Sequence, residues 1–225
     1  KGVLRMFVKV NGLKLFYQRT GSGRPFVLLH GNMEDHTIFD VLVKELSREY
    51  TVYALDSRNH GKSDSVPFLD YGEMAEDVAG FIAALELERP LLCGFSDGGI
   101  IGLLVASRYP ELLGKLVVSG ANLTPQGIQP LLRAGFKLAY CFSRSEKLEL
   151  MLTQPHITQA MLKRIKTPTL VLAGEKDLVT ERETRALAAH IPGAKLMILP
   201  GEGHGSYVVH SDKLYAAMEP FLRGE

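Results

Sequence analysis

Tryptophan is absent from this chain of 225 residues, and cysteine occurs only twice, as Cys93 and Cys141. Two cysteines make no disulfide framework in a chain of this length, which favours a reducing cytoplasm as the location. The first residue is not methionine, so the question whether a leader segment has been removed before it is left open. No apolar run approaches the roughly 20 residues that cross a bilayer, and the sequence therefore predicts no transmembrane segment.

A charge imbalance is missing as well. The 26 Lys and Arg residues nearly balance the 25 Asp and Glu residues, for a formal net charge of +1. A nucleic-acid partner would call for a clustered basic face, and no basic block stands out. There is no HExxH motif or Cys/His cluster, and "GSGRPF" (21–26) lacks the third glycine of the dinucleotide fingerprint. The sequence thus predicts no nucleic-acid partner, no metal and no other cofactor.

The chain does contain an alternation of apolar runs and helical patterns. Hydrophobic residues make up 46% of it, and no linker or repeat divides residues 1–225, so one globular domain is expected. Asn11-Gly12, between two alternating stretches, predicts a β-hairpin. Continuous apolar runs then come singly, each before a helical pattern: "PFVLLH", "TVYALD", "PLLCGF", "KLVVSG", "TPTLVLAG" and "AKLMILPG". Such runs suit strands buried on both faces, which predicts a three-layer α/β/α sandwich with a mostly parallel central sheet.

Three chemically complementary side chains follow three of these predicted strands. Ser96 comes after "PLLCGF", Asp177 after "TLVLAGEK" and His204 after "LMILPGEG". Ligands of open α/β sheets bind beyond the carboxyl ends of the strands, so the three are expected at one edge. A serine hydroxyl needs an imidazole to take its proton, and a carboxylate orients that imidazole. The sequence therefore predicts catalytic roles for Ser96, Asp177 and His204.

The segment "GFSDGG" (94–99) joins a predicted strand to a predicted helix that begins near Ser96. Serine and glycine are also ordinary turn residues, so the Gly-x-Ser-x-Gly pattern alone is weak evidence. At a strand-to-helix junction it is much stronger, because Gly94 and Gly98 leave room for a sharp bend. A helix that starts here also points backbone N–H groups at any oxyanion formed beside the serine.

Several stretches together resemble the α/β-hydrolase family, and the resemblance covers nearly the whole chain. They are "LLHGN" (28–32), "DSRNHGKSD" (56–64), "GFSDGG" (94–99), "GEKD" (174–177) and "GEGH" (201–204). The resemblance implies that Ser96 is the nucleophile, Asp177 the acid and His204 the base. It also implies an oxyanion hole made by the backbone N–H groups of Asn32 and Asp97. One departure is Asn59, where family members often have glycine, which puts only the local loop geometry in doubt.

The chain offers rivals for these roles. His30 is expected to brace the oxyanion loop and His60 to be a structural hydrogen-bonder, while the remaining histidines fit helix or surface positions: His36, His156, His190 and His210. Glu175 and Glu202 flank the same loops and are expected to be solvated. Asp97, in the first turn of a helix, needs no catalytic explanation for its side chain.

An insertion at about 122–161 separates two of the predicted strands. Its pattern predicts apolar helices. The insertion either packs on the body of the protein or forms a short cap over Ser96. We expect the cap, given where the insertion falls in the family, with an apolar acyl pocket lined by the following side chains: Met33, Leu131, Phe136, Tyr140 and Met151.

The sequence therefore predicts a serine carboxylesterase or small lipase for short- to medium-chain uncharged esters, acting through an acyl-enzyme without a cofactor. The same triad also suits a thioesterase, an aminopeptidase, a C–C hydrolase or a perhydrolase. An aminopeptidase would want carboxylates in the cap, where Glu146 and Glu149 are the local candidates. A non-catalytic ligand receptor on the same scaffold is a third reading. The only partner expected is the small ester substrate, and the oligomeric state is left open.

Overall fold

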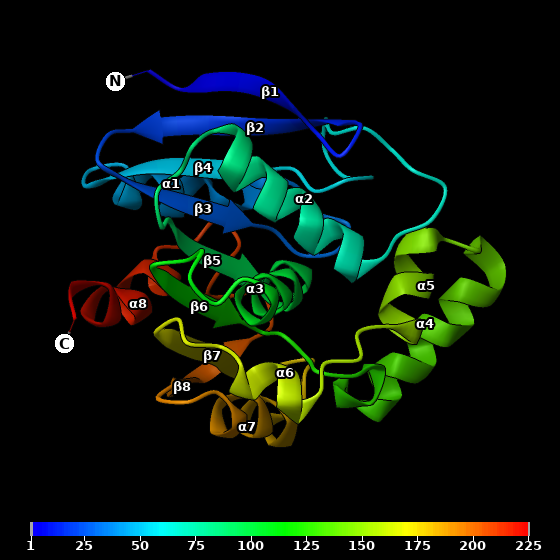
Figure 1. The fold of residues 1–225 in the computed structure, drawn as a ribbon. Helices are drawn as coiled ribbons and strands as arrows, with labels where there is room; N and C mark the ends of the chain where they lie inside the picture. The colour runs from blue at the N-terminus through cyan, green and yellow to red at the C-terminus, as the bar shows by residue number, and fades with distance from the viewer. Residues whose placement is uncertain (1, 225) are drawn as a thin grey trace.

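The fold is described by a computed structural model that covers residues 2–224. An eight-stranded sheet forms its centre, with the strand order β1-β2-β4-β3-β5-β6-β7-β8 (Figure 1). The strands are β1 (Leu4–Val10), β2 (Leu13–Gly21), β3 (Arg24–Leu29), β4 (Tyr50–Leu55), β5 (Leu91–Phe95), β6 (Lys115–Ser119), β7 (Thr169–Lys176) and β8 (Lys195–Gly203). Strands β3 to β8 pair in parallel, and only β1 and β2 run antiparallel to their neighbours. The predicted α/β fold with a mostly parallel sheet is confirmed.

The predicted hairpin joins β1 to β2. Asn11 and Gly12 both have positive φ, of 50° and 79°, which is the backbone conformation of a type I′ turn. Val10 pairs with Leu13 directly across this turn. The local sequence alone therefore specifies this connection.

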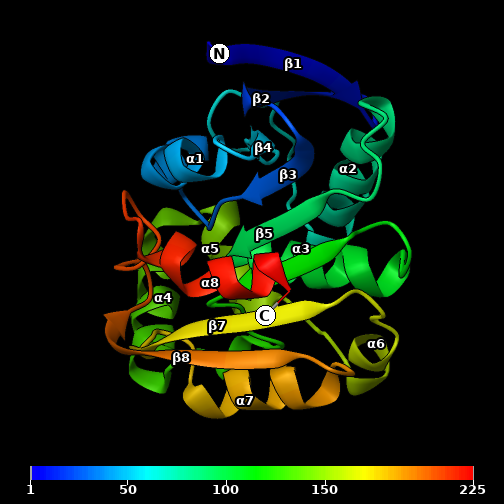
Figure 2. The same ribbon diagram turned by 90° about the vertical axis from the view of Figure 1, so that its left-hand side faces the viewer.

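Helices cover both faces of the sheet, as Figure 2 shows. Short 3-10 turns η1 (His36–Phe39) and η2 (Pro125–Gly127) accompany the α-helices, which are α1 (Asp40–Leu46), α2 (Tyr71–Ala84), α3 (Asp97–Arg108), α4 (Pro130–Ser143), α5 (Glu146–Thr153), α6 (Gln159–Lys163), α7 (Glu181–His190) and α8 (Lys213–Arg223). None of the helices in residues 2–224 has the length and apolarity to cross a membrane.

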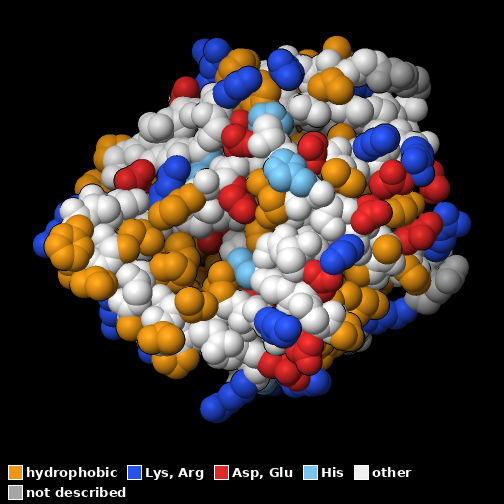
Figure 3. All heavy atoms as spheres, turned by 180° about the vertical axis from the view of Figure 1, so that it is seen from behind, with side chains coloured by type: hydrophobic (Ala, Val, Ile, Leu, Met, Phe, Trp, Pro, Cys, Tyr) orange, Lys and Arg blue, Asp and Glu red, His pale blue; other side chains and the backbone are white. Residues whose placement is uncertain are grey.

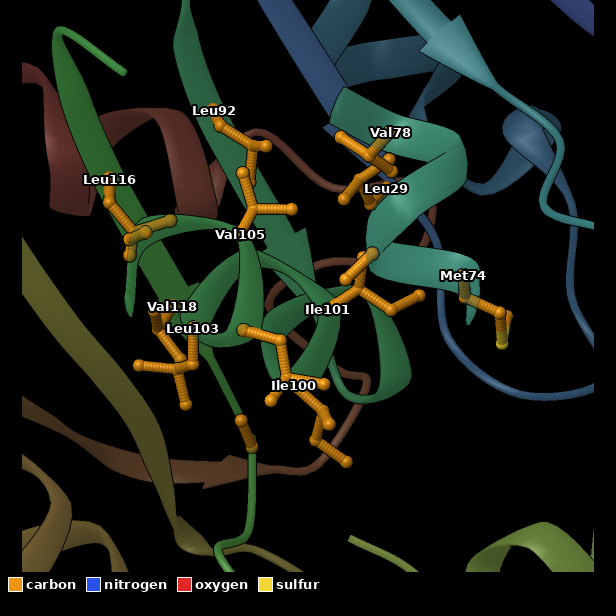
Figure 4. Close-up of a cluster of buried hydrophobic side chains, with 14 of the residues drawn as sticks. Leu29, Met74, Val78, Leu92, Ile100, Ile101, Leu103, Val105, Leu116 and Val118 are labelled. Atoms are coloured by element: carbon orange, nitrogen blue, oxygen red, sulfur yellow. The ribbon is translucent and has the colours of Figure 1, made fainter. Parts of the chain in front are cut away.

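Two buried apolar clusters hold the layers together. Successive strand residues enter opposite clusters: Leu28 faces α1 and α8, whereas Leu29 faces α2 and α3. Figure 4 shows the cluster that contains Leu29, in which Ile100 and Ile101 of α3 lie among side chains of the sheet and of α2. Burial on both sides explains why the central strands read as continuous apolar runs. Because α3 is anchored so firmly, its first residues are held rigidly at the edge of the sheet.

The predicted insertion contains the helices α4, α5 and α6. Figure 1 places α4 and α5 together beyond the ends toward which the parallel strands run. Leu148 and Leu150 anchor α5 in buried positions, whereas no residue of α4 is buried. The insertion is thus helical, as expected, and it lies on the side of the sheet where ligands of this architecture bind.

Candidate active site

Ser96 lies between the end of β5 and the first turn of α3, with φ 53° and ψ −114°. A non-glycine residue with positive φ is strained and persists only when its surroundings hold it. Here the Ser96 N–H donates to the Ser119 carbonyl at 2.7 Å, and the Gly98 N–H donates to the His30 carbonyl at 3.1 Å. These bonds fix the bend on both sides, and α3 begins at Asp97, one residue later than the sequence suggested.

Two glycines make this bend possible. A Cβ at Gly94 would collide with the backbone of Gly98, and a Cβ at Gly98 would collide with the backbone of Leu29. Both obstacles are backbone atoms, which cannot rotate away as a side chain can. Glycine is therefore required at both positions for the strand and the helix to meet as they do.

Ser96, His204 and Asp177 form one hydrogen-bonded chain. The Ser96 hydroxyl donates to His204 Nε2 at 3.0 Å, and His204 Nδ1–H donates to Asp177 Oδ1 at 2.6 Å. Asp177 is only 4% exposed and also accepts the N–H groups of Val179 and Gly174. A carboxylate held in this way fixes the tautomer of the ring, leaving Nε2 free to accept a proton from the serine. The structure thus brings together the three side chains that the sequence singled out.

The backbone beside Ser96 offers unused donors. Within residues 2–224, no backbone hydrogen bond is donated by the N–H groups of Asn32 or Asp97, the two predicted for the oxyanion hole. The loop that carries Asn32 is pinned to α5, because Asn32 Nδ2 donates to the Lys147 carbonyl at 3.1 Å. The next residue is pinned as well, since the Met33 N–H donates to His60 Nε2 at 3.2 Å. Free N–H groups on a braced loop are what preorganised oxyanion binding requires.

Buried histidines provide this bracing. His30 donates from Nδ1 to the Gly31 carbonyl and accepts the Ser57 N–H at Nε2. Burial lowers the pKa of His60 to about 4, so its ring stays neutral and can accept from Met33. His36 lies in the helical turn η1, one of the two positions expected of it, but it is not at the surface: its side chain is 8% exposed and its Nδ1 lies 2.7 Å from Asp56. Nothing in its local pattern revealed this long-range partner.

The loop that follows β4 contains Asn59, at the position where members of the family often have glycine. Asn59 has φ 61°, in the left-handed region, which asparagine tolerates better than other non-glycine residues. Its side chain also bridges the loop by accepting the Val66 N–H and donating to the Val66 carbonyl. Arg58, next to it, pairs with the buried Asp77 at 2.6 Å. Asparagine therefore adopts the left-handed conformation at this position, and its side chain stabilises the loop.

A cavity of about 200 Å³ opens over Ser96 and His204. Of the predicted lining residues, Met33, Phe136 and Met151 border it. The prediction was wrong for Leu131 and Tyr140, which do not line it, and Leu131 is 85% exposed. A helix turns about 100° per residue, so the five positions from Leu131 to Phe136 place the two on different faces of α4.

Four further residues border the cavity and were not among the predicted lining residues: Glu34, Phe95, Leu148 and Leu178. Glu34 is the most consequential, because burial raises the pKa of its carboxyl, and its Oε2 accepts the Gly31 N–H. Glu146 and Glu149, the cap carboxylates considered for an amine substrate, border a different hollow beside Phe68. No local signal marks Glu34, since only the turn after β3 carries it into the cavity.

A group of possible metal ligands also lies near this loop. Carboxylate and imidazole donors of Asp35, His36 and Asp56 fall within 4.8 Å of one another. Asp56 already accepts hydrogen bonds from His36 and from the Lys62 N–H, and Asp35 caps η1 through Thr37. These groups satisfy one another, and the set is explained as a structural hydrogen-bond network.

Comparisons with known proteins agree with this geometry. A family model described as the alpha/beta hydrolase fold matches residues 24–145, and a second, described as TAP-like protein, matches residues 149–224. The chain belongs to the α/β-hydrolase family. The protein named Serine hydrolase BPHL of Homo sapiens is 30% identical to this α/β-hydrolase, over 96% of this chain and 85% of that protein. Relatives of this kind support a hydrolase.

Solved structures show the same fold. The carboxylesterase CesB of Bacillus subtilis has a TM-score of 0.86 at 19% identity, covering 100% of this α/β-hydrolase and 93% of that chain. A putative lipase of Acinetobacter baumannii has a TM-score of 0.81 at 21% identity, covering 99% and 91%. At such low identities these likenesses concern the architecture, and the site residues rest on the geometry described above.

Proposed function

We propose that this α/β-hydrolase cleaves carboxylic esters of short to medium acyl chain through an acyl-enzyme on Ser96. The observation that carries the proposal is the chain from Ser96 through His204 to Asp177, with bonds of 3.0 and 2.6 Å, at the floor of an apolar cavity. A hydroxyl so placed can lose its proton to Nε2 as it attacks a carbonyl carbon.

The steps follow from the same geometry. As the Ser96 oxygen bonds to the carbonyl carbon, its proton moves to His204 and the carbonyl oxygen becomes an oxyanion, which the N–H groups of Asn32 and Asp97 stabilise. His204 then gives the proton to the departing alcohol, leaving the acyl group on Ser96. A water molecule, deprotonated by His204, hydrolyses this ester and restores the serine.

The cavity lining supports an apolar acyl group. Its walls are formed mainly by hydrophobic side chains of the loop after β3, of α4, of α5 and of the loop after β7: Met33, Phe136, Leu148, Met151 and Leu178. Helices α4 and α5 thereby act as a small cap. The limited volume is the reason to expect short and medium chains rather than long ones.

The test is hydrolysis of p-nitrophenyl esters from acetate to palmitate by the wild type and by Ser96→Ala. We expect turnover to peak at short or medium chains and to fall by about 10³-fold or more in the variant. A fluorophosphonate probe followed by mass spectrometry should label Ser96. Equal rates for the two proteins would refute the assignment of Ser96 as the nucleophile. Tight binding of a small molecule, with no labelling of Ser96 by the probe, would favour a non-catalytic receptor.

Glu34 favours a second candidate, an ester whose acyl group carries an amine. It is the one Asp, Glu, Lys or Arg side chain among the described residues that border the cavity. A buried carboxylate there would pair with an ammonium group. Glu34→Gln distinguishes the two candidates: a selective loss of kcat/KM for aminoacyl esters supports the second, and an equal effect on neutral and aminoacyl esters supports the first. Thioesters, amides and C–C substrates belong in the same panel, because the triad alone does not choose the bond.

A further inference from the structure

Strand β6 ends beside the candidate active site without contributing a side chain to the triad. Its last residue, Ser119, accepts the Ser96 N–H at its carbonyl oxygen, at 2.7 Å. The next residue, Gly120, donates its N–H to the Leu172 carbonyl of β7, the strand that leads to Asp177. The end of β6 is therefore bonded to the nucleophile and to the strand that precedes the acid.

The imidazole of His204 lies directly against this strand end. A Cβ at Gly120 would be 2.9 Å from His204 Cε1 and 3.0 Å from its Nδ1, so the ring occupies the space that a side chain would take. The ring also packs on Phe95, with the two ring centroids 4.8 Å apart. Such contacts restrict the ring, but they do not fix the loop that carries it.

Tyr207, three residues after His204, ties that loop to β6. Its hydroxyl oxygen lies 2.7 Å from Ser119 Oγ, with either group as the donor, and both residues are 0% exposed. Ser206 and His210 also make side-chain bonds from this loop, but at exposed positions where water competes for the same groups. A hydrogen bond in a buried, poorly polar place is costlier to break. The loop is therefore held from within the protein by the bond between Tyr207 and Ser119.

The two bonded hydroxyl groups lie away from the place where a substrate would bind. In Figure 3, seen from behind, the side of the molecule formed by α4 and α5 lies at the left, and the surface is hollowed beside the hydrophobic side chains that gather there. Ser119 and Tyr207 are buried beneath the surface, and neither borders the cavity over Ser96. Any effect of these two residues on catalysis must therefore act through the position of another residue.

We propose that Ser119 and Tyr207 are positioning residues that set the distance between the Ser96 hydroxyl and His204 Nε2. Ser119 holds the nucleophile through its carbonyl and the loop of the base through its hydroxyl, so one residue fixes both partners of the 3.0 Å bond. Proton transfer from the hydroxyl to the imidazole requires the two atoms to be within hydrogen-bond reach. The inference rests on the proposed function, because it concerns the same pair of residues.

The first test is hydrolysis of p-nitrophenyl acetate by Tyr207→Phe and Ser119→Ala, each of which deletes the bond. We expect kcat and kcat/KM to fall together by about tenfold, with KM nearly unchanged, because neither side chain borders the cavity. The rate at which a fluorophosphonate labels Ser96 should fall by a similar factor. The double variant Ser119→Ala/Tyr207→Phe should be no slower than either single variant, because all three lack the same bond.

Two matched controls remove a hydroxyl group of the same kind elsewhere. Tyr17→Phe deletes a bond to Met6 from a tyrosine on β2 that is 2% exposed. Ser107→Ala deletes a bond from a serine that is 3% exposed, at the opposite end of α3 from Ser96. Both controls are expected to lower the urea midpoint of unfolding without changing kcat. A loss of activity that only follows a loss of stability would appear in the controls as well.

Crystal structures of the wild type and Tyr207→Phe separate positioning from esterase activity. In the variant we expect the His204 ring to be displaced or to adopt more than one conformation, with its Nε2 farther from the Ser96 oxygen. This measurement still decides the proposal if the wild type cleaves no ester and the probe leaves Ser96 unlabelled. That result would refute the proposed function alone.

Three outcomes would overturn the proposal. The first is a wild-type kcat and a wild-type labelling rate in both Tyr207→Phe and Ser119→Ala. The second is a His204 ring that stays at its wild-type distance from Ser96 in the crystal structure of Tyr207→Phe. The third is a loss of kcat in the double variant equal to the product of the two single losses, because two residues that act through one bond can lose it only once.

Discussion

The hydroxyl of Tyr71, at the start of α2, donates to Asp97 Oδ1 at 2.7 Å, at the start of α3. Both side chains are buried, at 1% and 4% exposure. Burial raises the pKa of Tyr71 well above its ordinary value, so the phenol remains a donor. Burial also raises the pKa of Asp97 to about 6, even though Tyr71 and Asn32 lower it. The residue after the proposed nucleophile is therefore an acid held in a poorly solvated place.

Asp97→Asn should stabilise the protein at neutral pH and not in acid. The folded pKa of Asp97, about 6, lies above the ordinary value of 3.8 for an aspartate. The contribution of Asp97 to the free energy of unfolding is therefore greatest below about pH 4 and is lost as the pH rises through about 6. A pKa difference of about two units corresponds to about 2–3 kcal/mol. This is the upper limit for the increase in the free energy of unfolding that Asp97→Asn gives at about pH 8. The measurement is urea unfolding at several pH values.

The difference between variant and wild type is the quantity to follow, because other groups titrate in the same range. The lowered pKa of His60 makes stability rise with pH up to about 6.5, which opposes the effect of Asp97 and is common to both proteins. A difference for Asp97→Asn that does not vary with pH would contradict the buried-acid interpretation.

Gly94→Ala should destabilise the protein severely, whereas Gly135→Ala should not. The new methyl group at Gly94 meets the backbone of Gly98, so the bend at Ser96 has to open; we expect a loss of at least about 3 kcal/mol or no folded protein. Gly135 in α4 has nothing within 4 Å of its Cβ position, and alanine there should add about 0.5–1 kcal/mol. Thermal and urea unfolding of the two variants check this, and a Gly94→Ala protein as stable as the wild type would disprove the steric argument.

Phe136→Ala should shift the acyl-chain preference, and Leu131→Ala should not. Removing the Phe136 ring enlarges the cavity, so kcat/KM for longer p-nitrophenyl esters should rise relative to the acetate by about 3- to 10-fold. Leu131 points away from the cavity on the same helix and serves as the matched control. Equal shifts in the two variants would mean that α4 lines the site with a different face.

The fold and the triad could be predicted because their signals are local. Asn11-Gly12 specifies its hairpin by backbone conformation alone, and apolar runs of strand length indicate a sheet buried on both faces. Parallel strands carry their carboxyl ends to one edge, so residues after separate strands, such as Ser96 and His204, are brought together by the topology. Little side-chain detail is needed for that conclusion.

The side chains around the triad could not be predicted in the same way. The apolar pattern of α4 is amphipathic, but periodicity does not tell which face turns inward, and Leu131 was placed on the wrong side. His36 was expected on a helix or at the surface, and its burial against Asp56 could not be predicted because Asp56 is distant in the sequence. Glu34 lies in the loop after β3, where the Gly31 N–H donates to its carboxylate, and no local pattern marks this residue as one that borders the cavity.

By itself, the sequence determined the layered α/β architecture, the sharp bend at Ser96 and the three residues that the strand ends carry to one edge. These depend on periodicity, on glycine positions and on the rule that parallel strands share a direction. Only the tertiary structure decided which side chains line the cavity, which acids are buried and which face of α4 meets solvent. Burial and side-chain packing arise between segments far apart in the chain, so no local pattern encodes them.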